Sequence, residues 1–200
     1  IRKYRTRHDM CLKMGKISNI LIFGLLFFIS LNLYSQANGF KYFKYYSNEE
    51  YDHQPQNWGM VQAPNGIIYV ANHGGVLEFD GVSWRIIGIP GYDSVRSLAI
   101  DKAGTVFIGG INKIGYLEPD ANGSVKYKSL ADHLKDNEKD FSGVWGTHAT
   151  KDGIYFRTSK FLFRWDYKEI KVWTTPNVYW TSFVFNGDFI VQEKNRGLLK

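Results

Sequence analysis

The sequence predicts an all-β fold of the β-propeller type, with about four N-terminal blades of a longer ring, the last incomplete, and a signal peptide ahead of them. Two observations predict the ring. Residues 65–80 (NGIIYVANHGGVLEFD) place two short apolar strands between turns that contain Gly, and the pattern returns three times later in the chain. Gly contributes 20 of the 200 residues and aromatic residues 16%, which suits many short strands joined by tight turns.

Each repeat is located by the Gly in the turn between its first two strands. Gly66, Gly104, Gly153 and Gly187 occupy this position, and they are separated by 38, 49 and 34 residues. The first three repeats continue through a second strand to an Asp and then to another strand, which gives four strands in roughly 40 residues. Such a sheet has two apolar faces, and stacking the sheets around an axis buries both of them.

The repeats divide the chain into seven predicted segments. These are a leader with a secretory signal peptide (1–35), a first strand and connector (36–56), blade 1 (57–92), blade 2 (93–130), an inserted charged loop or helix (131–140), blade 3 (141–174) and a partial blade 4 (175–200). The strand expected in the second segment is the aromatic run at residues 40–46. The charged insertion accounts for the longest spacing between the turn glycines.

The basic character of the chain belongs to its leader. Six basic residues and one acidic residue precede Ile17, whereas 19 basic and 18 acidic residues follow from Gln36 onward, so no nucleic-acid binding is expected there. Lys13 and Lys16, the apolar run at residues 20–29 and a small, polar stretch up to Ser35 have the order of a cleaved secretory signal. An uncleaved anchor is the alternative, although the run is shorter than the roughly 20 residues that span a bilayer.

The sequence offers no credible active site. Cys11, the only cysteine, precedes the apolar run, so the exported part has no thiol for a disulfide, a nucleophile or a metal. The histidines show no metal-ligand spacing, and the acidic residues in the turns are better explained as Asx turns; these residues are His53, His73, His133, His148, Asp80, Asp101, Asp120, Asp152 and Asp166. No catalytic residue, metal site or cofactor is predicted for this segment.

One position in each blade is a candidate for ligand binding. Eight residues before the turn glycines, early in the innermost strand, lie Trp58, Arg96, Trp145 and Tyr179, with Trp180 adjacent to the last. We expect these side chains to converge near the central channel, where aromatic faces stack on sugar rings and Arg clamps a carboxylate, as an anionic glycan would require. The alternative is that they pack between blades as ordinary core.

Two runs in the chain resemble a known repeat family. Residues 57–84 (NWGMVQAPNGIIYVANHGGVLEFDGVSW) and 95–110 (VRSLAIDKAGTVFIGG) are similar to two-component regulator propeller repeats, which form the periplasmic sensor regions of Bacteroidetes hybrid histidine kinases and helix-turn-helix regulators. The resemblance covers about residues 40–200 and is closest in blades 1 and 2. It departs where the aromatic-Val-Gly-Thr ending of the family becomes YVAN at residues 69–72 and FRTS at residues 156–159.

The resemblance implies an exported, ligand-sensing propeller on the periplasmic side of a regulator anchored in the inner membrane. A triple-tyrosine module, a transmembrane helix and a kinase or DNA-binding output would follow, so the whole protein would be an enzyme only if that output is a histidine kinase. The implied partners are a glycan or another extracytoplasmic ligand, the remaining blades and downstream modules, and a second copy joined through those modules. Two alternatives stay open: a secreted propeller enzyme acting on polysaccharide, and a structural or adhesion propeller.

Overall fold

The computed structural model describes residues 43–91 and 94–200, so the predicted signal peptide and the start of the predicted strand at residues 40–46 lie outside the described residues. The chain divides into two compact units, Ile1–Tyr45 and Tyr46–Lys200, and every helix and strand described belongs to the second. No helix in the described ranges is long and apolar enough to cross a lipid bilayer.

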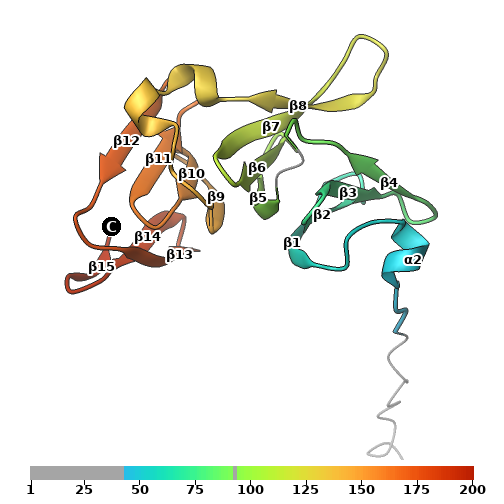
Figure 1. The fold of residues 1–200 in the computed structure, drawn as a ribbon, viewed down its shortest axis with the longest axis horizontal. Helices are drawn as coiled ribbons and strands as arrows, with labels where there is room; N and C mark the ends of the chain where they lie inside the picture. The colour runs from blue at the N-terminus through green and yellow to red at the C-terminus, as the bar shows by residue number, and fades with distance from the viewer. Residues whose placement is uncertain (1–42, 92–93) are drawn as a thin grey trace, which may run out of the picture. The chain divides into compact units, whose positions relative to one another are not determined.

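The second unit consists of four antiparallel sheets, each formed by strands that are consecutive in the chain (Figure 1). Blade 1 contains β1 (Asn57–Gln62), β2 (Ile68–Asn72), β3 (Gly75–Phe79) and β4 (Trp84–Ile87). Blade 2 contains β5 (Val95–Ile100), β6 (Val106–Gly110), β7 (Lys113–Pro119) and β8 (Val125–Ser129). Blade 3 contains β9 (Gly146–Thr150), β10 (Gly153–Arg157), β11 (Phe161–Trp165) and β12 (Ile170–Thr174). Blade 4 contains β13 (Tyr179–Phe185), β14 (Asp188–Glu193) and β15 (Gly197–Leu199).

The predicted all-β propeller architecture is confirmed by this arrangement of blades. The first strand of each blade is the innermost one: β1 lies against β5, β5 against β9, and β9 against β13. The candidate ligand-binding residues all lie in or next to these four strands, so the fold places them along one axis of the molecule.

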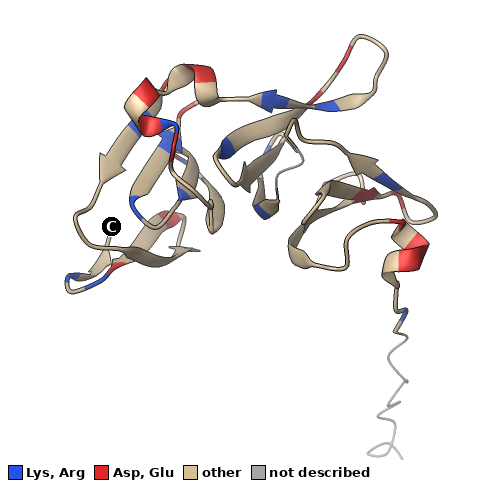
Figure 2. Ribbon diagram, viewed as in Figure 1, with Lys and Arg blue, Asp and Glu red and all other residues tan. Residues whose placement is uncertain are grey.

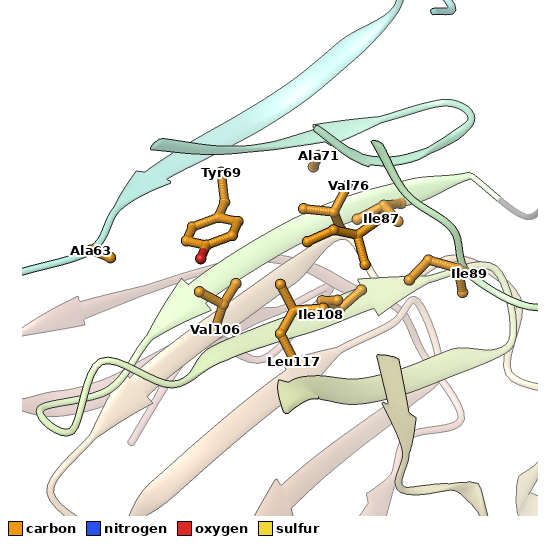
Figure 3. Packing of buried hydrophobic residues seen from close by; sticks show 10 residues of the cluster. Ala63, Tyr69, Ala71, Val76, Ile87, Ile89, Val106, Ile108 and Leu117 are labelled. Atoms are coloured by element: carbon orange, nitrogen blue, oxygen red, sulfur yellow. The ribbon is translucent and has the colours of Figure 1, made fainter. Parts of the chain in front are cut away.

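Apolar side chains from neighbouring blades form the cores between the sheets. In the first interface, Tyr69 and Val76 of blade 1 face Ile108 of blade 2 (Figure 3). In the second interface, Phe107 and Ile114 of blade 2 pack with Phe156 of blade 3. Both faces of a central blade are therefore buried, and this explains why β6 of blade 2 is apolar without the alternation of a half-exposed strand.

The acidic turn residues act as predicted in four of five cases. The Oδ1 atoms of Asp80, Asp101, Asp120 and Asp166 each accept hydrogen bonds from two backbone N–H groups two to four residues later. This pattern closes the turn locally without help from another element. Asp152 differs, because it is the donor: its backbone N–H donates to Thr150 Oγ1 at 3.1 Å.

The charged insertion at residues 131–140 forms two short 3-10 helices, η2 (Ala131–His133) and η3 (Asp136–Glu138), in place of one longer helix. Its polar residues are mostly exposed, as expected for a surface insertion. The sequence did not suggest that it also contributes to the core. Leu134 is 5% exposed and packs with Phe163 in the cluster between blades 2 and 3.

The strand predicted at residues 40–46 is not present in its described part, residues 43–46. A strand requires the edge of a sheet, and the aromatic ring of Tyr46 instead packs edge-on against Phe79 and Trp84 at centroid distances of 5.1 and 5.4 Å. The connector then forms a single helical turn, α2 (Asn48–Tyr51), for which Ser47 is the N-cap.

A buried amide holds this connector to blade 1. Asn72 is fully buried at the end of β2, and its Nδ2 donates to the Gln54 carbonyl oxygen at 2.6 Å and to Asn57 Oδ1 at 2.7 Å. Its Oδ1 accepts from the Gly74 N–H at 2.9 Å. The side chain therefore satisfies groups on three separate segments.

We expect Asn72→Ala to lower the free energy of unfolding by about 2 kcal/mol, because it leaves several buried polar groups without partners. Urea unfolding followed by tryptophan fluorescence measures the change. Asn65→Ala is the matched control, since the exposed Asn65 side chain accepts only the Ile67 N–H. Equal stabilities for the two variants would contradict this account of Asn72.

Candidate functional site

The innermost strands of three blades each contain a β-bulge at a residue singled out from the sequence. The register shifts in β1, β5 and β13 leave Trp58, Arg96 and Trp180 without a cross-strand partner. A bulge inserts one extra residue, bends the strand and changes the direction of its side chain. In these three blades, the residues singled out from the sequence therefore share a β-bulge, where the regular pairing of the strands is interrupted.

Trp145 has a similar position in blade 3, immediately before β9. Its backbone N–H donates to the Arg157 carbonyl oxygen at 2.8 Å, and the next residue, Gly146, is the cross-strand partner of Arg157. Two consecutive residues therefore face one residue of β10, as in a bulge.

Three of these side chains, from three different blades, are in contact. The Arg96 guanidinium lies 4.0 Å from the ring centroid of Trp58 and 5.0 Å from that of Trp145. The two indole rings are 6.0 Å apart at an interplanar angle of 73°. We call Trp58, Arg96 and Trp145 the rim cluster. The predicted convergence is confirmed for these three residues, whereas ligand binding by them stays a prediction.

The rim cluster keeps much of its surface accessible. Trp58 is 37% exposed and Trp145 is 45% exposed, and Arg96 is half-buried between them. Arg96 Nε is buried and has no hydrogen-bond partner. No carboxylate of residues 43–91 and 94–200 forms an ion pair with this guanidinium. A cation next to two aromatic faces is stabilised by the rings, but its buried Nε–H still lacks an acceptor among the described residues.

Tyr179 and Trp180 do not join the rim cluster. Tyr179 is 6% exposed and packs with Phe189 between blades 3 and 4, as the core-packing alternative predicted. Trp180 is 61% exposed, and no ring contact joins it to the cluster in the part of the chain that the structure describes.

The length of the first hairpin in blade 4 explains why counting from the turn glycine selects Tyr179, although the bulge is at Trp180. In blade 4 Phe185 pairs with Asp188, so only two residues form the turn, whereas five separate the paired residues Gln62 and Ile68 in blade 1. Counting back eight residues from Gly187 therefore ends one residue before the bulge.

Next to the rim cluster, blade 3 contributes a polar group that the sequence prediction did not include. Arg157 Nε donates to Ser182 Oγ at 3.1 Å, and its Nη1 donates to the Tyr179 carbonyl oxygen at 3.2 Å. His148 Nε2 lies 2.8 Å from the same Ser182 Oγ. The group joins β9 and β10 to β13 and fixes the backbone of blade 4 beside its bulge.

Arg157 occupies a place where blades 1 and 2 have small residues. It pairs with Gly146, as Ala71 pairs with Gly59 in blade 1 and Gly109 with Ser97 in blade 2. The FRTS ending at residues 156–159, which departs from the endings of the first two repeats, was therefore the available sequence signal for Arg157.

Burial changes the electrostatics of this group. It lowers the pKa of Arg157, and it lowers the pKa of His148 to about 4, with the nearby Arg157 guanidinium as the second cause. Both effects follow from removing a cation from water without giving it a carboxylate partner. His148 is consequently neutral near pH 7.

Basic and acidic positions are interspersed along the ribbon of the blades (Figure 2). Among the described residues, no group of three or more His, Cys, Asp or Glu side chains is placed so that it could hold a metal ion.

Comparison with known proteins gives a structural likeness only. No protein-family model matches the chain, and no curated protein matches it. The chain is similar to two crystal structures of the extracellular domain of BT4673 from B. thetaiotaomicron, a protein described as a hybrid two-component system in one and as a one-component system in the other. The TM-scores are 0.59 and 0.57, and the sequence identity is 14% in both cases.

The likeness covers 76% of this chain and 22% of the other, so the chain spans about a fifth of the length of these neighbours. At this identity the likeness shows the fold: the blades of this chain are arranged like those of an extracellular domain from a signalling protein.

Proposed function

We propose that the chain is an exported, ligand-sensing propeller segment of a membrane-spanning signal-transduction regulator, and that the rim cluster binds its ligand. The observation that carries the proposal is the meeting of Trp58, Arg96 and Trp145 from three blades, with partly exposed indoles and a buried Arg96 Nε that has no partner among the described residues. Residues that served packing alone would be buried, with their polar atoms paired. The likeness of the fold to extracellular domains of a signalling protein supports the periplasmic side of the membrane as its location.

A ligand at this place touches blades 1, 2 and 3 at the same time. Binding is then stronger to the arrangement of blades that brings the three side chains together, and this differential affinity shifts the population of that arrangement. The remaining blades, the downstream modules and a second copy of the protein are the proposed recipients of the shift. The proposal assigns no catalytic step to this segment.

A reporter assay on the complete protein in its native membrane tests the proposal. Cells carrying the wild type are treated with a panel of oligosaccharides from host and plant polysaccharides, and the transcriptional output is measured. We expect Trp145→Ala to raise the ligand concentration needed for half-maximal output by about tenfold or more, because it removes an aromatic contact of the central cluster.

Trp180→Ala is the matched control, since Trp180 is an exposed tryptophan outside the rim cluster. Its response should equal that of the wild type. Equal losses in both variants, or no response of the wild type to any member of the panel, would contradict the proposal.

A further inference from the structure

We infer that the rim cluster selects an acidic ligand, namely a sugar that carries a carboxylate or sulfate group. The inference rests on the proposed function, because it names the ligand class of the same site. Its starting point is Arg96, a cation of the rim cluster that forms no ion pair with any carboxylate in residues 43–91 and 94–200.

Arg96 differs from Arg85 and Arg196 in what surrounds it, whereas Arg164 shares its buried, unpaired Nε but lies over one indole, that of Trp173, at 5.8 Å. Arg85 pairs with Glu78 at 2.7 Å, and Arg196 pairs with Glu193 at 2.9 Å. Arg96 contacts only aromatic faces, and its buried Nε has no acceptor in the described residues. A donor withdrawn from water without an acceptor is costly, and a ligand oxygen that accepts from it removes that cost.

The stacking also restricts the direction from which a ligand binds. The centroids of Trp58 and Trp145 lie 4.0 and 5.0 Å from the Arg96 guanidinium but only 6.0 Å from each other, so the two rings cover adjacent sides of the cation and a ligand must approach from the other sides. The five N–H groups of a guanidinium lie in one plane and match two oxygens of a carboxylate or sulfate group. Trp58 and Trp145 are both partly exposed, so indole surface next to the cation is available to the apolar face of a sugar ring.

A second cation strengthens the positive potential at this end of the inner strands. Arg157 is 7% exposed and forms no ion pair with any carboxylate in residues 43–91 and 94–200; its partners are Ser182 Oγ and the Tyr179 carbonyl oxygen. Glu193, the cross-strand partner of Tyr179, is already paired with Arg196. Uncompensated positive charge next to an open aromatic surface attracts anions and disfavours cations. Arg157 thus acts as a positioning residue and adds to the field, while Arg96 is the proposed contact.

The test compares ligands that differ only in charge, using the complete protein in detergent and isothermal titration calorimetry. One arm uses tetragalacturonate and its methyl-esterified form, and the other uses a keratan sulfate tetrasaccharide, which contains no uronic acid, and its desulfated form. The arms distinguish a carboxylate from a sulfate as the recognised group. We expect the acidic form to bind about tenfold or more tightly than its neutralised partner in at least one arm, with an affinity that falls as salt rises.

Two substitutions of Arg96 test whether the rim cluster causes the preference for the acidic form. Arg96→Gln should abolish the preference for the acidic form, and Arg96→Lys should keep only part of it, because Lys lacks the planar fork. Lys171→Gln is the matched control, since Lys171 is also a cation over an indole, 4.9 Å from the ring centroid of Trp173, but lies outside the rim cluster. It should leave the preference unchanged.

The outcomes separate this inference from the proposed function. If the acidic and neutralised forms bind equally and Trp145→Ala abolishes that binding, the rim cluster binds a ligand but does not select an acidic one. This result overturns the inference and keeps the proposed function. An acidic preference that Arg96→Gln leaves intact overturns the assignment to Arg96. Absence of binding in both arms overturns the inference as well, and the reporter assay then decides separately whether the segment senses a ligand.

Discussion

Phe156→Ala is expected to lower the free energy of unfolding by about 3–5 kcal/mol. Phe156 is fully buried at the interface of blades 2 and 3, and its ring centroid lies 6.5 Å from that of Phe107. Removing the ring loses its transfer free energy and leaves a cavity that the surrounding strands cannot easily fill, because the ladder hydrogen bonds of β10 fix its backbone on both sides. Urea unfolding followed by circular dichroism measures the loss.

Phe185→Ala is the control for this prediction. Phe185 lies in β13 and is 64% exposed, so its removal should change the free energy of unfolding by well under 1 kcal/mol. If Phe156→Ala were no more destabilising than Phe185→Ala, the stacking of blades 2 and 3 would not be a source of stability.

Acidification is expected to destabilise the fold through His148. The unfolded chain takes up a proton on this residue near pH 6.5, whereas in the folded state burial and the Arg157 guanidinium lower the pKa to about 4. The unfolded state therefore binds more protons between these two values, and stability falls as the pH drops from 6.5 to 4. Above pH 6.5 the contribution is fully present, and its loss by pH 4 is about 3 kcal/mol.

His148→Gln isolates this contribution from that of the carboxylates. Gln is neutral throughout the range and has an amide that can bond to Ser182 Oγ in the same place. We expect the difference in unfolding free energy between wild type and variant to change by about 3 kcal/mol between pH 7 and pH 4. If the unfolding free energies of wild type and variant changed with pH in parallel, His148 would have the same pKa in the folded and unfolded states, and the prediction would be wrong. A separate NMR titration of the ring protons should give the folded pKa directly.

The blades could be predicted from the sequence because their determinants are local. Turn glycines, Asx turns such as those at Asp80 and Asp101, and runs of apolar residues act within a few positions of each other. The rim cluster could be predicted in part for the same reason. Counting from a turn glycine finds Trp58 and Arg96 because their hairpins have the same length, and it misses the bulge at Trp180 because the hairpin of blade 4 is shorter.

Features that depend on contacts between blades could not be predicted in this way. The burial of Leu134 requires the cluster that blades 2 and 3 form together. The hydrogen bonds of Arg157 reach residues 22 and 25 positions away, on a strand of the next blade. The connector contains the helix α2 because the Glu50 N–H donates to the Ser47 carbonyl oxygen and the Ser47 N–H donates to Glu50 Oε1, a short-range effect that was present in the sequence but overlooked.

The bulge in the innermost strands bears on how such a protein diversifies. A residue at a bulge has no partner across the ladder, so its replacement leaves the pairing of β1, β5 and β13 intact. After duplication of a blade, this position can therefore drift among Trp, Arg or other side chains while the scaffold is inherited unchanged. Under the proposed function, ligand preference and fold stability are then separable traits under selection, and new specificities can arise one blade at a time.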